Sequence, residues 1–261
     1  MLESEAIDLK ILLHISFLGT GYCGYQIQKN KPTVQGELCR AAERVFSAPC
    51  DITGCSRTDS GVHANEFCAT VTFKGQSGID TSIPIGKIPI AFSTVLPRDI
   101  SVWKAEWVDE DFHPRYGVLY KEYEYRIYND PIPDPFLSGR CWHYPRAIDG
   151  GALEKMKEAA SFFVGKQDFA AYMAAGSDVK DTTRTVVSAS VTREGNLIIF
   201  RVSADGFLYN MVRILTGTLI AVAEGKIKPS EIKSVTESLD RKKAGITAPA
   251  EGLYLNKVTY K

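Results

Sequence analysis

Residues 206–223 form the long apolar stretch of the sequence, and Arg213 is their only charged residue. A transmembrane helix of about 20 residues rarely carries an arginine, and this stretch also contains Asn210, Thr216 and Thr218. We therefore expect a buried helix inside a folded protein and no membrane span. A buried guanidinium left unpaired costs several kcal/mol, so a carboxylate should approach Arg213 unless the side chain reaches solvent.

The length and charge of the chain limit its class. It has 261 residues, of which 44% are hydrophobic and 24% charged. This composition is typical of a globular protein with one large domain or two halves, and it excludes disordered, collagen-like and coiled-coil chains. Lysine plus arginine number 31, and aspartate plus glutamate also number 31. Any polyanion must therefore be bound by local basic patches.

The cysteines and the N-terminal residues bear on location. The sequence has six cysteines and no C-x-x-C pair, which favours free thiols in a reducing compartment. Residues 1–10 are acidic and lack the apolar region of a signal peptide. We therefore expect a cytoplasmic protein.

Hydrophobic periodicity predicts the order of the elements. Alternating residues predict strands over 10–17, 66–73, 100–108, 116–128 and 253–260, with two more strands joined by a turn at 194–196. Helical spacing appears from Thr33, over 153–163 up to a stop at Gly165, from about Phe207 and after Pro229. Gly19, Gly21 and Gly24 predict a loop with unusual backbone angles. The pattern indicates an α+β fold in which helices cover one face of an antiparallel sheet and the other face is open to a ligand.

Residues 54–64 form the densest cluster of ionisable side chains. Asp59 and His63 are two potential metal ligands, but no third ligand lies at a suitable spacing and a closed site needs about four. The alternative is structural, with Arg57 and Asp59 as a loop ion pair and His63 as a capping or core histidine. Residue types alone do not decide between these interpretations. His14, His113 and His143 show no partner pattern and are interpreted as structural.

Nine short motifs follow one another along nearly the whole chain. They are G-Y-x-G-Y-Q-x-Q (21–28), T-V-Q-G-E-L (33–38), S-R-T-D-S-G-V-H-A (56–64), L-P-R-D-I (96–100), F-H-P-R-Y (112–116), K-E-Y-E-Y-R-I-Y-N (121–129), D-F-A-A-Y (168–172), F-L-Y-N-M-V-R (207–213) and A-P-A-E-G-L-Y-L (248–255). In this order they resemble the motifs of the TruA family of tRNA pseudouridine synthases, and nine in register make a chance match negligible.

The resemblance implies roles for five residues. Asp59 matches the catalytic aspartate, and Arg57 the arginine that pairs with it or takes the place of the flipped base. Tyr123 matches a tyrosine that stacks on the target base. Arg213 matches an arginine that pairs with the carboxylate, and Leu253 an apolar residue of the base pocket. Without the resemblance, Tyr123 and Leu253 would be read as ordinary strand and core residues.

The resemblance also implies an architecture and a reaction. The expected fold has two ferredoxin-like halves, residues 1–110 with the catalytic loop and residues 111–261, that share an antiparallel sheet around a central active-site cleft. The expected activity is isomerisation of uridines 38 to 40 in the anticodon stem-loop of tRNA by a homodimer. The reaction has no net redox change, so neither a cofactor nor a metal is expected. A carboxylate that is ionised at neutral pH can act as the nucleophile, at C6 of the base or C1′ of the sugar.

Two departures and two alternatives accompany this interpretation. Tyr25 stands where the family usually has tryptophan, and Asp205-Gly206 replaces a more usual Asn-Ala; the first could alter RNA docking. The alternatives are a non-catalytic RNA-binding protein with this fold, or a synthase that acts on other uridines. Basic residues could bind the RNA together. Residues 226–243, for example, contain six basic and three acidic residues.

Overall fold

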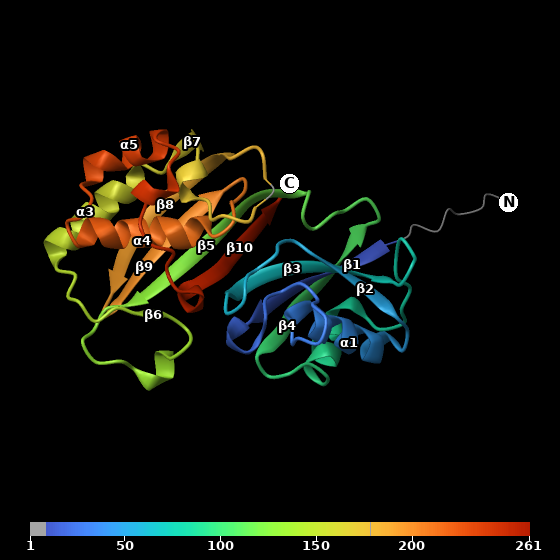
Figure 1. Ribbon diagram of the computed structural model, residues 1–261. Coiled ribbons are helices and arrows are strands. Elements are labelled where there is room, and N and C mark those ends of the chain that lie inside the picture. Colours follow the sequence, from blue (N-terminus) through green and yellow to red (C-terminus); the bar gives the residue numbers. More distant parts are fainter. Residues whose placement is uncertain (1–8, 178) are drawn as a thin grey trace. The chain divides into compact units, whose positions relative to one another are not determined.

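The computed structural model describes residues 9–177 and 179–261 (Figure 1). It divides into two compact units. Unit 1 comprises Met1–Leu119 and Lys257–Lys261, and unit 2 comprises Tyr120–Asn256. The end of the chain therefore returns to unit 1.

Unit 1 has the element order β-α-β-β-α-β. Its elements are β1 (Leu9–Phe17), α1 (Val34–Phe46), β2 (Cys50–Gly54), β3 (His63–Phe73), α2 (Ile88–Ser93) and β4 (Ile100–Asp109). The strands pair antiparallel in the order β4-β1-β3-β2, which is the ferredoxin-like arrangement. The sequence analysis did not predict β2 or α2, because segments of five and six residues are too short to show a period.

Helix α1 forms where the helical spacing placed it. The side chain of Thr33 caps its first turn by accepting a hydrogen bond from the backbone N–H of Gly36. Val34, Leu38 and the pair Ala41–Ala42 are buried, as the spacing predicts. The helix thereby covers β2.

The described residues of unit 2 contain the element order of unit 1 with two further strands and one further helix. Its elements are β5 (Val118–Tyr128), β6 (Trp142–His143), α3 (Gly150–Ser161), β7 (Gly165–Asp168), β8 (Thr183–Glu194), β9 (Leu197–Ala204), α4 (Met211–Ala223), α5 (Ile232–Glu237) and β10 (Leu253–Tyr260). The strands follow the order β10-β5-β9-β8-β7. Figure 1 shows α3, α4 and α5 together on one face of these strands. The predicted α+β class with ferredoxin-like halves is therefore confirmed.

Short 3-10 helices occur in both units. They span Gly19–Gly21, Ile85–Lys87, Pro135–Leu137, Ala170–Tyr172, Pro229–Glu231, Arg241–Lys243 and Ala250–Gly252.

Three local expectations need correction. Of the three glycines near residue 20, only Gly24 has a positive φ, at 92°, and Gly19 is instead required by a close backbone approach. Helix α3 ends at Ser161, and Gly165 opens β7 with a φ of 114°. The apolar helix starts at Met211, because Asn210 takes a left-handed conformation that no α-helix continues.

Helix α4 is buried because a neighbouring chain segment runs along it. The backbone N–H of Gly245 donates to the hydroxyl of Thr218 at 2.9 Å, and Ala248 N–H donates to the carbonyl of Arg213 at 3.1 Å. Gly217 has no room for a side chain, since an added Cβ would lie 1.9 Å from the carbonyl oxygen of Ile246. In the described part of the chain, no helix is long and apolar enough to cross a membrane.

The close contact between Gly217 and Ile246 predicts how a methyl group at position 217 changes the stability of the protein. Gly217→Ala should lower the free energy of unfolding by about 2 kcal/mol or more, because the backbone at Ile246 must move away from α4. Gly150→Ala is the control, since Gly150 also lies in a helix, as the first residue of α3, but has nothing within 4 Å of an added Cβ. Chemical denaturation should show the loss in the first variant and no loss in the second. Equal stabilities would contradict the tight contact.

Candidate functional site

The loop that joins β2 to β3, residues 55–62, carries the predicted catalytic carboxylate; we call it the Asp59 loop. It starts with a hydrogen bond from Cys55 N–H to the carbonyl of Cys68 at 2.8 Å. It ends in a turn in which Val62 N–H donates to the carbonyl of Asp59 at 3.2 Å, with Gly61 at a φ of 81°. Asp59 is half-buried. Hydrogen bonds therefore hold the backbone of the Asp59 loop both before and after the carboxylate.

The first glycine-rich segment of the chain, residues 19–25, packs against the Asp59 loop. Tyr25 N–H donates to the carbonyl of Thr58 at 3.1 Å. A Cβ on Gly24 would lie 2.7 Å from that same oxygen, and a Cβ on Gly19 would lie 2.0 Å from the carbonyl oxygen of Val62. Glycine is thus required at both positions by close backbone contact.

His63 belongs to this support. Its side chain is fully buried, and its Nδ1 accepts a hydrogen bond from the N–H of Gly19 at 2.9 Å. This bond agrees with the capping or core interpretation of His63, because the nitrogen already holds the glycine segment in place. Arg57, in the same unit, is exposed.

Tyr25, at the position where the resemblance implies a tryptophan, is a core residue and not a surface one. It is 3% exposed, and its ring lies 4.3 Å from that of Phe67. Its hydroxyl is buried without a hydrogen-bond partner among the described residues, as is the hydroxyl of Thr58. A buried unpaired hydroxyl costs about 1–3 kcal/mol. The identity of residue 25 therefore affects the packing of the core next to the Asp59 loop.

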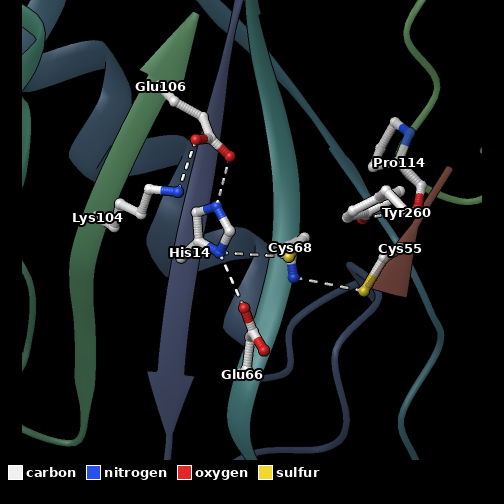
Figure 2. A network of polar contacts seen from close by, with 8 residues as sticks. All are labelled: His14, Cys55, Glu66, Cys68, Lys104, Glu106, Pro114 and Tyr260. Atoms are coloured by element: carbon white, nitrogen blue, oxygen red, sulfur yellow. Dashed lines mark hydrogen bonds and ion pairs between the residues drawn. The ribbon is translucent and has the colours of Figure 1, made fainter. Parts of the chain in front are cut away.

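His14 has partners that the sequence pattern did not indicate. Its ring lies between Glu66 on β3, at 3.0 Å, and Glu106 on β4, at 2.9 Å, as Figure 2 shows. Lys104 binds the other oxygen of Glu106 at 2.6 Å, and hydrogen bonds from Lys104 and His14 lower the pKa of that carboxyl. These contacts follow from the pairing of three strands, so one strand's sequence cannot predict them.

The same network contains a group with metal-ligand chemistry. The ligand atoms of His14, Glu66 and Cys68 all lie within 4.8 Å of one another. Burial raises the pKa of the Cys68 thiol, so it is protonated at neutral pH. Asp59 and His63, the pair considered from the sequence, are not part of this group.

In unit 2, the predicted stacking residue lies on a strand. Tyr123 is on β5 opposite Val202 of β9 and is 7% exposed. Its ring packs edge-on against Phe207, with centroids 4.9 Å apart and planes at 82°. Phe207 therefore fixes the orientation of the Tyr123 ring, a role that the sequence analysis did not assign.

Arg213 is held at the start of α4. Its Nε donates to the carbonyl of Ala248 at 2.7 Å, and one terminal nitrogen donates to the side chain of Asn210 at 2.7 Å. The guanidinium is half-buried. Leu253, 7% exposed, begins β10 a few residues after Ala248. The sequence analysis did not identify Asn210 as a partner of Arg213; Asn210 precedes α4, but its side chain makes no capping hydrogen bond and accepts from the guanidinium instead.

The structure thus brings the five predicted residues into two groups. Arg57 and Asp59 share the Asp59 loop of unit 1. Tyr123, Arg213 and Leu253 belong to unit 2, where the segment after α4 connects Arg213 to Leu253. The first group contains a carboxylate and a guanidinium, and the second contains an aromatic ring, a guanidinium and an apolar side chain.

Comparisons with known proteins agree with this chemistry. A family model described as tRNA pseudouridine synthase matches residues 159–261. A "tRNA pseudouridine synthase A" of Thermoanaerobacter sp. (strain X514) is 42% identical over 96% of this chain and 99% of its own length. The protein of that name in Acetivibrio thermocellus is 43% identical, and "tRNA pseudouridine synthase A 2" of Clostridium perfringens is 44% identical, with the same coverage.

A solved structure, "Crystal Structure of a Cbf5-Nop10-Gar1 Complex", aligns with 94% of this chain and 49% of that chain at 15% identity and a TM-score of 0.37. At this identity and TM-score, the likeness supports no conclusion about the present chain. The identities above 40% extend over nearly the full length of both chains. The chain therefore belongs to the tRNA pseudouridine synthase A family, whose motifs it carries.

Proposed function

We propose that the protein converts uridine to pseudouridine in the anticodon stem-loop of tRNA, at positions 38 to 40, with Asp59 as the catalytic carboxylate. The observation that carries this proposal is the Asp59 loop, whose backbone is bound on both sides of the carboxylate by hydrogen bonds and close glycine contacts. The names of the relatives support tRNA as the substrate.

The reaction breaks the bond from C1′ of the ribose to N1 of uracil and forms a bond from C1′ to C5. The proton on C5 leaves and N1 gains a proton, so atoms and charge balance without an oxidant or reductant. The carboxylate of Asp59 acts as the nucleophile, at C6 of the base or at C1′ of the sugar. Both routes need the carboxylate held still against the nucleotide, which the loop contacts favour.

The target nucleotide must leave the base stack to reach a carboxylate, at a cost of a few kcal/mol. Stacking on an aromatic ring stabilises an extruded base by about 1–3 kcal/mol. We assign this role to Tyr123, whose ring is oriented by Phe207. We assign Arg57 to the flipped base or the carboxylate, Arg213 to the charge of Asp59, and Leu253 to the apolar wall of the base pocket.

Two other functions are distinguishable by experiment. A non-catalytic RNA-binding protein has no use for a carboxylate that repels phosphates, so the position of Asp59 disfavours it. A synthase of other uridines would share every contact described above. Incubation with unmodified tRNA transcripts, followed by mapping of pseudouridine at each position, separates the three cases.

We also propose an oligomeric state and a cellular location. We expect two copies to act together on one tRNA, because a chain of zero net charge gains basic surface by pairing. We place the enzyme in the cytoplasm, in keeping with free thiols at all six cysteines, each of which lies in the described part of the chain.

Replacing Asp59 tests the nucleophile. Asp59→Asn keeps the size of the side chain and removes its charge, so pseudouridine formation should fall by at least a thousandfold while tRNA binding persists. Asp51→Asn is the control, because Asp51 is an exposed aspartate on β2 of the same unit. Single-turnover assays should leave the control near the wild-type rate. Activity of Asp59→Asn near that rate would refute the assignment.

The glycine contact predicts a second effect on catalysis. Gly24→Ala adds a methyl group 2.7 Å from the carbonyl oxygen of Thr58 and should displace the Asp59 loop, lowering kcat about tenfold or more. Gly75→Ala has a similar backbone strain, with a φ of 76°, but nothing within 4 Å. Both variants should lose about 1 kcal/mol of stability from that strain, and only the first should lose kcat. A normal kcat in Gly24→Ala would show that the loop position is uncritical.

Two variants of Tyr123 separate stacking from proton transfer. Tyr123→Phe keeps the ring, whereas Tyr123→Leu removes it, and Tyr120→Phe on the same strand is the control. If the ring acts by stacking, the first variant stays nearly fully active and the second loses activity by about tenfold or more. If Tyr123→Phe is inactive although RNA binds, the hydroxyl takes part in removing the C5 proton. Normal rates in both would place Tyr123 outside the site.

A further inference from the structure

We propose that a pocket beside the Asp59 loop binds a phosphodiester of the substrate RNA, and that Tyr116 stacks on an adjacent base. This inference rests on the proposed function and adds a binding site to it. The pocket lies entirely within unit 1 and has a volume of about 220 Å³. One wall is formed by Ser56 and Arg57 of the Asp59 loop, and another by His113, Arg115 and Tyr116. We call it the Arg115 pocket.

The charge of the pocket fits a phosphate. Arg57 and Arg115 are both exposed and both line it, and no aspartate or glutamate is among its lining residues in the described part of the chain. Two guanidinium groups facing one small volume repel each other unless an anion lies between them. Arginine binds phosphate oxygens with two parallel N–H donors, so a phosphodiester is the natural complement.

The wall that carries Arg115 is preorganised by His113. The Nδ1 of this histidine accepts hydrogen bonds from the backbone N–H groups of Arg115 at 3.1 Å and Tyr116 at 3.3 Å. The carbonyl of His113 also accepts from Gly117 N–H at 2.9 Å. The segment therefore presents the Arg115 and Tyr116 side chains from a closed turn, which reduces the entropy lost on binding.

Tyr116 has the properties of a stacking platform. Its side chain is 76% exposed, and its ring lies 4.3 Å from the ring of His113, with the planes at 35°. The guanidinium carbon of Arg115 is 5.9 Å from the centre of the same ring. An exposed aromatic ring beside arginines is the usual combination in proteins that bind single-stranded nucleic acid.

The position of the pocket indicates which part of the RNA it takes. Arg57 lines the pocket and precedes Asp59 by two residues in the Asp59 loop. A strand whose uridine reaches Asp59 therefore places its neighbouring phosphate within reach of the Arg115 pocket, while Arg57 stays with the flipped base or the carboxylate. The Arg115 pocket would then hold the strand next to the target and would act on binding more than on the chemical step.

The first experiment measures tRNA modification by Arg115→Gln and by Arg44→Gln, an exposed arginine on α1 of the same unit. We expect KM to rise about tenfold in Arg115→Gln with kcat unchanged. The slope of log KM against log salt should fall by about one unit, as for the loss of one phosphate contact. Arg44→Gln should match the wild type. Equal KM values and salt slopes in the two variants would overturn the proposal.

A second experiment identifies the phosphate. Anticodon stem-loops that carry a single neutral methylphosphonate at successive positions are bound to Asp59→Asn, with and without Arg115→Gln. We expect one position at which the methylphosphonate weakens binding to Asp59→Asn but has no further effect on the double variant. If no position shows this loss of additivity, the pocket binds at most a free anion and the proposal is wrong.

Tyr116 is tested in the same assay. Tyr116→Phe should bind as the wild type does, and Tyr116→Leu should bind about tenfold more weakly. Equal binding by both would remove the stacking role. Failure of the proposed function itself is seen separately, since the wild-type protein would then form no pseudouridine in tRNA whatever these variants bind.

Discussion

The candidate site depends on one close contact, the packing of the glycine segment 19–25 against the Asp59 loop. Tyr25 N–H binds the carbonyl of Thr58, in the middle of the loop, and Gly19 N–H binds the side chain of His63, just after the loop. The contact exists because β1 and β3 pair antiparallel, which places the end of β1 beside the start of β3. Side chains at positions 19 or 24 would separate the segments.

The two units form similar folds from different sequences. Each contains a β-α-β-β-α-β core, to which unit 2 adds β6, β7 and α5, yet no residue-level repeat is visible between them. In unit 1 the loop after β2 carries the carboxylate. In unit 2 the residues that we assign to the site lie on β5, at the start of α4 and at the start of β10. A common scaffold thus supplies different chemistry from different positions.

Unit 2 also explains how an arginine is tolerated in an apolar helix. The carbonyl of Ala248 and the side chain of Asn210 each accept a hydrogen bond from the guanidinium of Arg213. These bonds offset part of the cost of burial and fix the direction of the group. They do so because the chain after α4 turns back along the helix at Gly217, where only glycine allows the approach.

The sequence by itself determined the longer elements and their order, the α+β class and the family, because hydrophobic periodicity and short motifs are local properties, but it missed short elements such as β2 and α2. It also singled out Asp59, Arg57, Tyr123, Arg213 and Leu253, whose roles remain predictions. Only the tertiary structure decided that His14 bridges Glu66 and Glu106, that Tyr25 lies in the core, and that Arg57 and Arg115 share a pocket. Each of these depends on residues from different strands or loops, and such contacts are set by strand pairing and packing, which no single segment encodes.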